Sequence, residues 1–119
     1  MVALGGALGS IARWGLTGAV QRWSGSPLPW GTFAVNAIGS LAIGFVAALA
    51  LERTLVSPSA RLFLVTGLLG GFTTFSALSY ETFALLRDGQ WIAAIGYSFG
   101  SVVIGVAAAL AGYGLALRI

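Results

Sequence analysis

The chain has 119 residues, of which 58% are hydrophobic and only 8% are charged. Soluble domains carry roughly 25% charged residues, so six basic and three acidic side chains are too few to cover a water-facing surface. This composition excludes a soluble enzyme and predicts a membrane protein. The sequence contains no His and no Cys, which excludes zinc, haem, iron–sulfur and thiol chemistry. The net charge of +3 comes from scattered arginines, so we expect no nucleic-acid partner.

Four apolar stretches follow one another along the chain, and their lengths suit membrane-spanning helices. They cover about residues 2–20, 31–51, 61–86 and 91–117. A helix needs about 20 residues to cross a bilayer, and four such helices leave roughly 30 residues for loops and ends. Only helices and closed barrels satisfy every backbone group in lipid, and near-continuous apolar runs are wrong for barrel strands. We therefore predict an all-α membrane protein in which residues 1–119 form one transmembrane domain.

The first span carries an arginine, and the third carries a carboxylate. An arginine or aspartate at the centre of a membrane helix costs about 2.5 to 3.5 kcal/mol on insertion scales, so a functional role is the default interpretation for Arg13 and Glu81. The alternative is a structural partner for each charge, which includes a pair between the two. The spacing of Gly5 and Gly9 on the first span is typical of closely packed membrane helices.

The second and fourth spans each carry a polar stripe at helical spacing. Thr32, Asn36 and Ser40 repeat every four residues on the second span, as Tyr97 and Ser101 do on the fourth. Asn36 is the most informative of these residues, because a buried amide needs several hydrogen-bond partners. Its alternative role is an interhelical hydrogen bond. For Ser40 and Ser101 the alternative is a bond to a carbonyl of the same helix.

The third span contains a sequence that forms a helix poorly. Residues 66–79 combine paired glycines at 70–71 with three threonines, two phenylalanines and two serines. Glycine costs about 1 kcal/mol against alanine within a helix, and Thr and Ser side chains compete for backbone hydrogen bonds. An open backbone group in lipid costs several kcal/mol, so a break must be buried in protein, line water or bind an ion. We predict a broken helix whose freed carbonyls bind a cation, and keep a glycine kink as the alternative.

The arginines near the span ends do not favour one orientation strongly. Four spans put both termini on one side of the membrane, with three arginines on that side and two on the other. One interpretation is that the terminal side is cytoplasmic. The other is a chain that inserts both ways and forms an antiparallel dimer.

Three segments together resemble the Fluc (CrcB) family of fluoride channels. They are residues 5–14 (GGALGSIARW), 31–40 (GTFAVNAIGS) and 70–76 (GGFTTFS), of which the last is the most specific. The resemblance covers nearly the whole chain. It implies an antiparallel, dual-topology homodimer that exports fluoride passively through two pores in the inner or plasma membrane. It also implies a structural sodium ion at the dimer centre, held by the backbone carbonyls of Gly70 and Thr73.

The resemblance also assigns expected roles to polar and aromatic residues. The family's pore asparagine falls on Asn36, with Thr32 one turn before it, and its polar track on the last span falls on Tyr97 and Ser101, the next member being replaced by Gly105. Its arginine and its carboxylate fall on Arg13 and Glu81. Independently of the family, we expect a pore for a strongly hydrated anion to supply hydrogen-bond donors. The candidate donors are Asn36, Ser76, Ser79, Tyr97 and Ser101.

One position departs from the family pattern. The family has two phenylalanines three residues apart, whereas this chain has Phe75 followed by Leu78. An aromatic edge carries partial positive charge and can face an anion, and a leucine cannot. Three alternatives follow for fluoride passage: it is slower, it uses only the Phe75 ring, or it depends on a non-identical partner subunit.

The competing function is a proton-coupled exporter of the small multidrug resistance type. Such exporters need a carboxylate in the first span, where this chain has Arg13.

Overall fold

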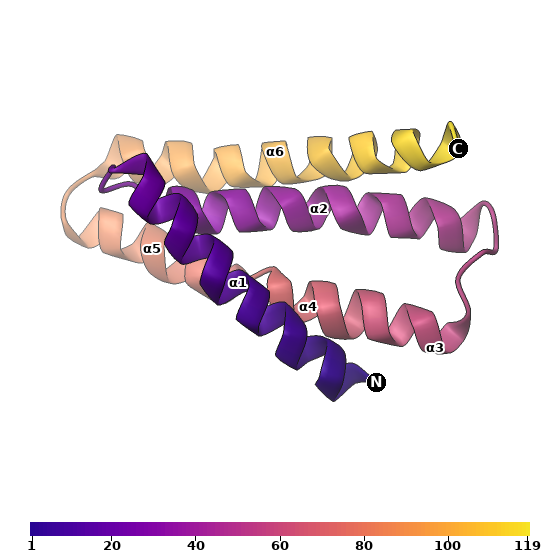
Figure 1. Ribbon diagram of the computed structural model, residues 1–119. Helices are drawn as coiled ribbons and strands as arrows, with labels where there is room; N and C mark the ends of the chain where they lie inside the picture. Colours follow the sequence, from indigo (N-terminus) through magenta and orange to yellow (C-terminus); the bar gives the residue numbers. More distant parts are fainter.

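The computed structural model describes residues 1–119 and contains helices but no strands. The chain forms four helical segments, of which the third is divided into several pieces (Figure 1). The elements in chain order are α1 (Val2–Ser24), α2 (Trp30–Leu51), α3 (Pro58–Arg61), the π-helical stretch η1 (Leu62–Leu69), α4 (Gly70–Phe72), α5 (Phe75–Arg87) and α6 (Trp91–Leu117). The prediction of an all-α chain is confirmed.

Local sequence signals explain where several helices begin and end. Ser57 caps the third segment by accepting a hydrogen bond from the Ala60 N–H at 3.1 Å, and Pro58 occupies the first helical position. Gly25 ends α1 with a φ of 61°, a left-handed conformation that glycine adopts without steric penalty. These signals explain why α1 ends at Ser24 and why the third segment begins at Pro58.

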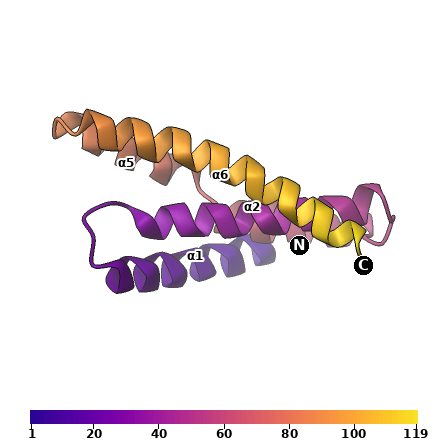
Figure 2. The ribbon, with the colours of Figure 1, turned by 90° about the horizontal axis from the view of Figure 1, so that it is seen from above.

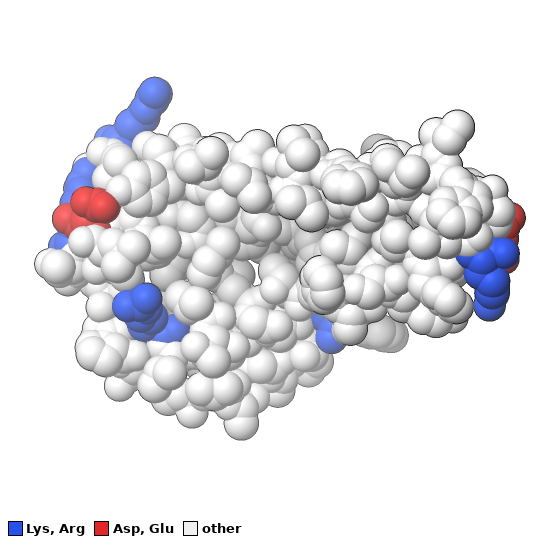
Figure 3. All heavy atoms as spheres, turned by 180° about the vertical axis from the view of Figure 1, so that it is seen from behind, with Lys and Arg blue, Asp and Glu red and all other residues white.

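Three of the four segments are long and apolar enough to cross a membrane, namely Trp30–Leu51, Pro58–Arg87 and Trp91–Leu117. The prediction of four spans is thus confirmed for three. α1 has 23 residues, but Arg13 and Arg22 make it more polar than the others. The molecule is 48 Å long, and its charged side chains gather mainly at its two ends (Figure 3). Its length matches a bilayer of about 40–45 Å with headgroups.

The segments pack through small residues. α2 and α6 run in the same direction, and both chain termini lie at one end of the molecule (Figures 1 and 2). A Cβ atom added at Gly44 of α2 would overlap the Ala109 carbonyl, and one at Gly9 of α1 would overlap the Leu68 carbonyl. Close backbone approach therefore holds α2 against α6 and α1 against η1, as in other membrane bundles.

Few residues are buried within the single chain. Only 13 of 119 residues are buried, and the only large side chain that is fully buried is Val35. Most large apolar side chains face outward, so the exterior requires lipid or another protein surface to cover it.

Candidate functional site

The third segment is interrupted at two threonines near its middle. Thr73 has φ −84° and ψ 157°, and Thr74 has φ −150° and ψ 117°, so both are extended between the helices α4 and α5. The prediction of a broken rather than a kinked helix is confirmed. The break lies at Thr73 and Thr74, within the expected residues 66–79, and Gly70 and Gly71 remain helical.

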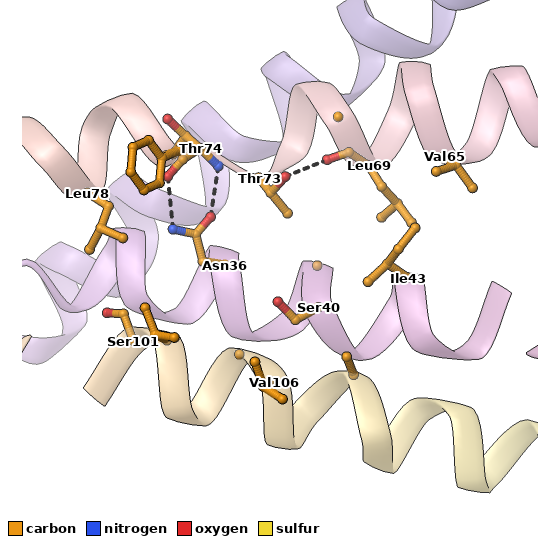
Figure 4. A pocket seen from close by; sticks show the side chains of 16 residues that line it. Asn36, Ser40, Ile43, Val65, Leu69, Thr73, Thr74, Leu78, Ser101 and Val106 are labelled. Atoms are coloured by element: carbon orange, nitrogen blue, oxygen red, sulfur yellow. Dashed lines mark hydrogen bonds between the residues drawn. The ribbon is translucent and has the colours of Figure 1, made fainter. Parts of the chain in front are cut away.

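Asn36 of α2 holds the broken backbone in place. Its Nδ2 donates to the Thr74 carbonyl at 3.0 Å, and its Oδ1 accepts from the Thr74 N–H at 2.8 Å (Figure 4). The Thr74 hydroxyl in turn accepts from the Ala77 N–H at 3.1 Å and so caps α5. The interhelical hydrogen bond proposed as the alternative role of Asn36 is therefore present. The Asn36 side-chain NH2 has two N–H groups, and only one of them is used in these bonds.

The break leaves the Gly70 and Thr73 carbonyls, among others, without their helical donors. In an uninterrupted helix the Thr74 N–H would bond to the Gly70 carbonyl, and the Ala77 N–H would bond to the Thr73 carbonyl. In the structure these donors go to Asn36 and to the Thr74 hydroxyl instead. The Gly70 and Thr73 carbonyls are the two that the resemblance assigns to a cation.

A cavity of about 510 Å³ lies beside the break, between the third segment, α2 and α6 (Figure 4). It brings together six of the residues predicted to form the site. They are Asn36, Gly70, Thr73, Phe75, Leu78 and Ser101. The predicted donors Ser76 and Ser79 do not line this cavity, and both are exposed on the surface of α5. The Phe75 side chain is 80% exposed, so the single chain covers little of this ring.

One serine hydroxyl at the cavity differs from other hydroxyls of the bundle. The hydroxyls of Thr73 and Ser98 donate to the carbonyls of Leu69 and Ala94 in their own helices. The Ser101 Oγ is buried and has no hydrogen-bond partner. The bond to its own helix that was considered for this serine is thus absent.

A second polar group surrounds Glu81 on α5. The Thr32 hydroxyl donates to Glu81 Oε2, and the Tyr97 hydroxyl donates to Glu81 Oε1, both at 3.1 Å. Thr32 is 3% exposed, so this part of the cluster is buried. The three residues come from α2, α5 and α6, and Thr32, Glu81 and Tyr97 are absent from the cavity lining. We call them the carboxylate cluster.

Arg13 and Glu81 do not pair with each other. The Arg13 Nε donates to the Gly71 carbonyl at 3.0 Å, which fastens α1 to the turn before the break. Glu81 accepts its hydrogen bonds from Thr32 and Tyr97. Both charged side chains thus have structural partners, but the predicted alternative of an Arg13–Glu81 pair is wrong.

The structure places nine of the predicted site residues in the cavity lining or the carboxylate cluster, and it adds two residues at the break. Ser40 lines the cavity, and Thr74 is the residue that Asn36 holds. The four-residue spacing of Thr32, Asn36 and Ser40 already indicated that Ser40 lies on the same helix face as Asn36. Thr74 belongs to the GGFTTFS segment, but nothing in the sequence indicated its pairing with Asn36, which lies 38 positions away.

Comparison with known proteins agrees with the sequence motifs. A family model described as CrcB-like protein, Camphor Resistance (CrcB), matches residues 1–113. The chain is 55% identical over 115 residues to the fluoride-specific ion channel FluC of Thermus thermophilus, covering 97% of this chain and 91% of that protein. It is 51% identical over 116 residues to FluC of a Roseiflexus species, with coverage of 97% and 93%. It is 46% identical over 112 residues to FluC of Aquifex aeolicus, with coverage of 94% and 90%.

Proposed function

The chain belongs to the CrcB family of ion channels, and from this premise we propose that it conducts fluoride passively across the cell membrane. It is a multi-pass membrane protein rather than an enzyme. In a bacterium the expected location is the inner or plasma membrane, where passive conduction lets fluoride leave the cell down its electrochemical gradient.

The observation that carries this proposal is the cavity at the helix break. A small anion holds its water strongly, so a pore must replace that water with hydrogen-bond donors. The cavity offers the unpaired hydroxyl of Ser101, the remaining N–H of Asn36 and the ring of Phe75. Aromatic edges carry partial positive charge, so Phe75 also suits an anion. These groups lie together in an otherwise apolar bundle, which favours a short polar path over a purely structural helix contact.

We propose that the working unit is an antiparallel homodimer inserted in both orientations. The 80% exposure of Phe75 supports a second copy, because a ring that lines a pore must be enclosed. The division of the arginines between the two ends also supports insertion in either direction. A heterodimer, in which the partner supplies a second aromatic ring near Leu78, is the alternative arrangement.

We also propose a structural sodium ion at the break, with the Gly70 and Thr73 carbonyls among its ligands. The redirected donors of Thr74 and Ala77 support this fit, since the carbonyl oxygens of Gly70 and Thr73 lose their helical hydrogen bonds. Backbone oxygens at a discontinuous membrane helix are ligands that suit Na⁺. When bound, the ion supplies a fixed positive charge that favours anions nearby.

Efflux from liposomes containing the purified full chain tests the function. Vesicles loaded with fluoride should empty passively without a proton gradient, and vesicles loaded with chloride should not. Preparation in sodium-free N-methylglucamine buffer should slow the fluoride efflux. Equal release of both anions would contradict selectivity. Uptake of organic cations driven by protons would instead support the exporter, which the engagement of Glu81 by two donors does not favour.

A further inference from the structure

Two serine hydroxyls face the cavity from neighbouring helices. Ser101 lies on α6, and its Oγ has no hydrogen-bond partner. Ser40 lies on α2 and lines the same cavity, where no bond joins its hydroxyl to another lining residue (Figure 4). The hydroxyl of Thr73 is different, because it donates to the Leu69 carbonyl. Ser40 and Ser101 are thus the lining serines whose O–H groups remain available to a ligand.

Ser40 lies next to Gly105, the position on α6 where the stripe of hydroxyl side chains is interrupted. Tyr97, Ser101 and Gly105 follow at intervals of four residues on that helix, and Gly105 has no side chain. A Cβ atom added at Gly105 would lie 3.4 Å from the Ser40 Oγ. The Ser40 hydroxyl therefore reaches the position where a side chain at residue 105 would begin, and it continues the line of hydroxyls from α6 onto α2.

We propose that Ser40 is an ion-contacting residue, whose hydroxyl donates a hydrogen bond to the anion beside Gly105. This inference rests on the proposed fluoride conduction and adds a residue to its path. A serine hydroxyl can turn to place its proton toward an anion, and a hydrogen bond to a charged group is stronger than one between neutral groups. The path then passes from the Ser101 hydroxyl to the Ser40 hydroxyl, across two helices.

The test moves the hydroxyl from one helix to the other. Ser40→Ala keeps the Cβ atom and removes the Oγ, so we expect fluoride efflux from liposomes to slow about tenfold, as for the loss of one charge-assisted hydrogen bond. Adding Gly105→Ser to Ser40→Ala places a new hydroxyl in the space that the substitution opens, and efflux should recover to within about threefold of the original rate. Ser98→Ala is the matched control, since that hydroxyl bonds only to carbonyls of its own helix.

Each outcome separates this inference from the function on which it rests. Unchanged efflux in Ser40→Ala, with normal efflux in the original chain, would overturn the role of Ser40 and leave fluoride conduction intact. Slow efflux in Ser40→Ala without recovery in the double variant would assign Ser40 a packing role and also overturn it. Absence of fluoride efflux in the original chain would overturn the proposed function, and the inference with it. Melting temperatures in detergent, equal across the four proteins, are expected if all variants fold.

Discussion

The helix break and the carboxylate cluster are both polar regions of an apolar bundle, but they use their hydrogen bonds differently. In the carboxylate cluster both oxygens of Glu81 accept from a neighbouring helix, one from Thr32 and one from Tyr97. At the break the Ser101 hydroxyl has no partner, and the helical donors of two carbonyls are redirected. The cluster therefore joins α2, α5 and α6, whereas the break leaves polar groups without such partners.

This difference shows what spacing in a sequence leaves undecided. Thr32 and Asn36 lie on one stripe of α2, yet Thr32 belongs to the cluster and Asn36 to the break. Helical spacing identifies residues that share a face. It does not identify which of them retain donors or acceptors after the bundle forms, and those remaining groups decide where an ion can bind.

Replacing Asn36 should have the largest effect, because it removes the link on which the break depends. Asn36→Ala leaves the N–H and C=O of Thr74 without the bonds seen in the structure. An unsatisfied buried group costs about 1–3 kcal/mol, so the free energy of unfolding should fall by about 2 kcal/mol or more. Fluoride efflux should fall more than about tenfold. Chemical unfolding in micelles and liposome efflux measure the two effects.

The control for this substitution is Thr82→Val, which removes a hydroxyl that bonds only to Leu78 of its own helix. It should leave both stability and efflux close to those of the original chain. If Asn36→Ala behaves like Thr82→Val, the two bonds to Thr74 do not hold the break.

Replacing Glu81 should have a smaller effect, confined mainly to stability. In Glu81→Gln the amide nitrogen cannot accept a hydrogen bond, so either Thr32 or Tyr97 loses its acceptor. The free energy of unfolding should fall by about 1–2 kcal/mol, and efflux should slow about threefold. A double variant with Tyr97→Phe should be less destabilised than the sum of the single effects, because the residues share one network. Strict additivity would show that they act independently.

The smallest effect is expected at Leu78, which lines the cavity near Phe75. Leu78→Phe adds a ring whose edge carries partial positive charge and can face an anion. Fluoride efflux should match that of the original chain or exceed it by up to about threefold. Leu78→Ile, which adds no ring, should leave the rate unchanged. Loss of all flux in Leu78→Phe would contradict the position assigned to Leu78 in the path.

Local chemistry predicted the helices and the existence of the break, but not its details. The apolar run at residues 61–86 indicated the third segment, and glycines and threonines at 70–74 indicated that its helix would be interrupted. The exact interruption was not predictable, because it depends on an amide from α2 that competes for the Thr74 backbone. The hydrogen-bond partner of Arg13 could not be predicted either. Its acceptor is the main-chain carbonyl of Gly71, and every residue carries such a carbonyl.

The bond between Asn36 and Thr74 also constrains the order of assembly. During translation α2 leaves the ribosome before the third segment, so the Asn36 amide is made before the two threonines. Without that amide, the incoming segment would have to expose bare peptide groups to hydrocarbon or stay outside it. Asn36 thus satisfies peptide groups that are synthesised 38 residues later, and we expect insertion of the third segment to require this side chain.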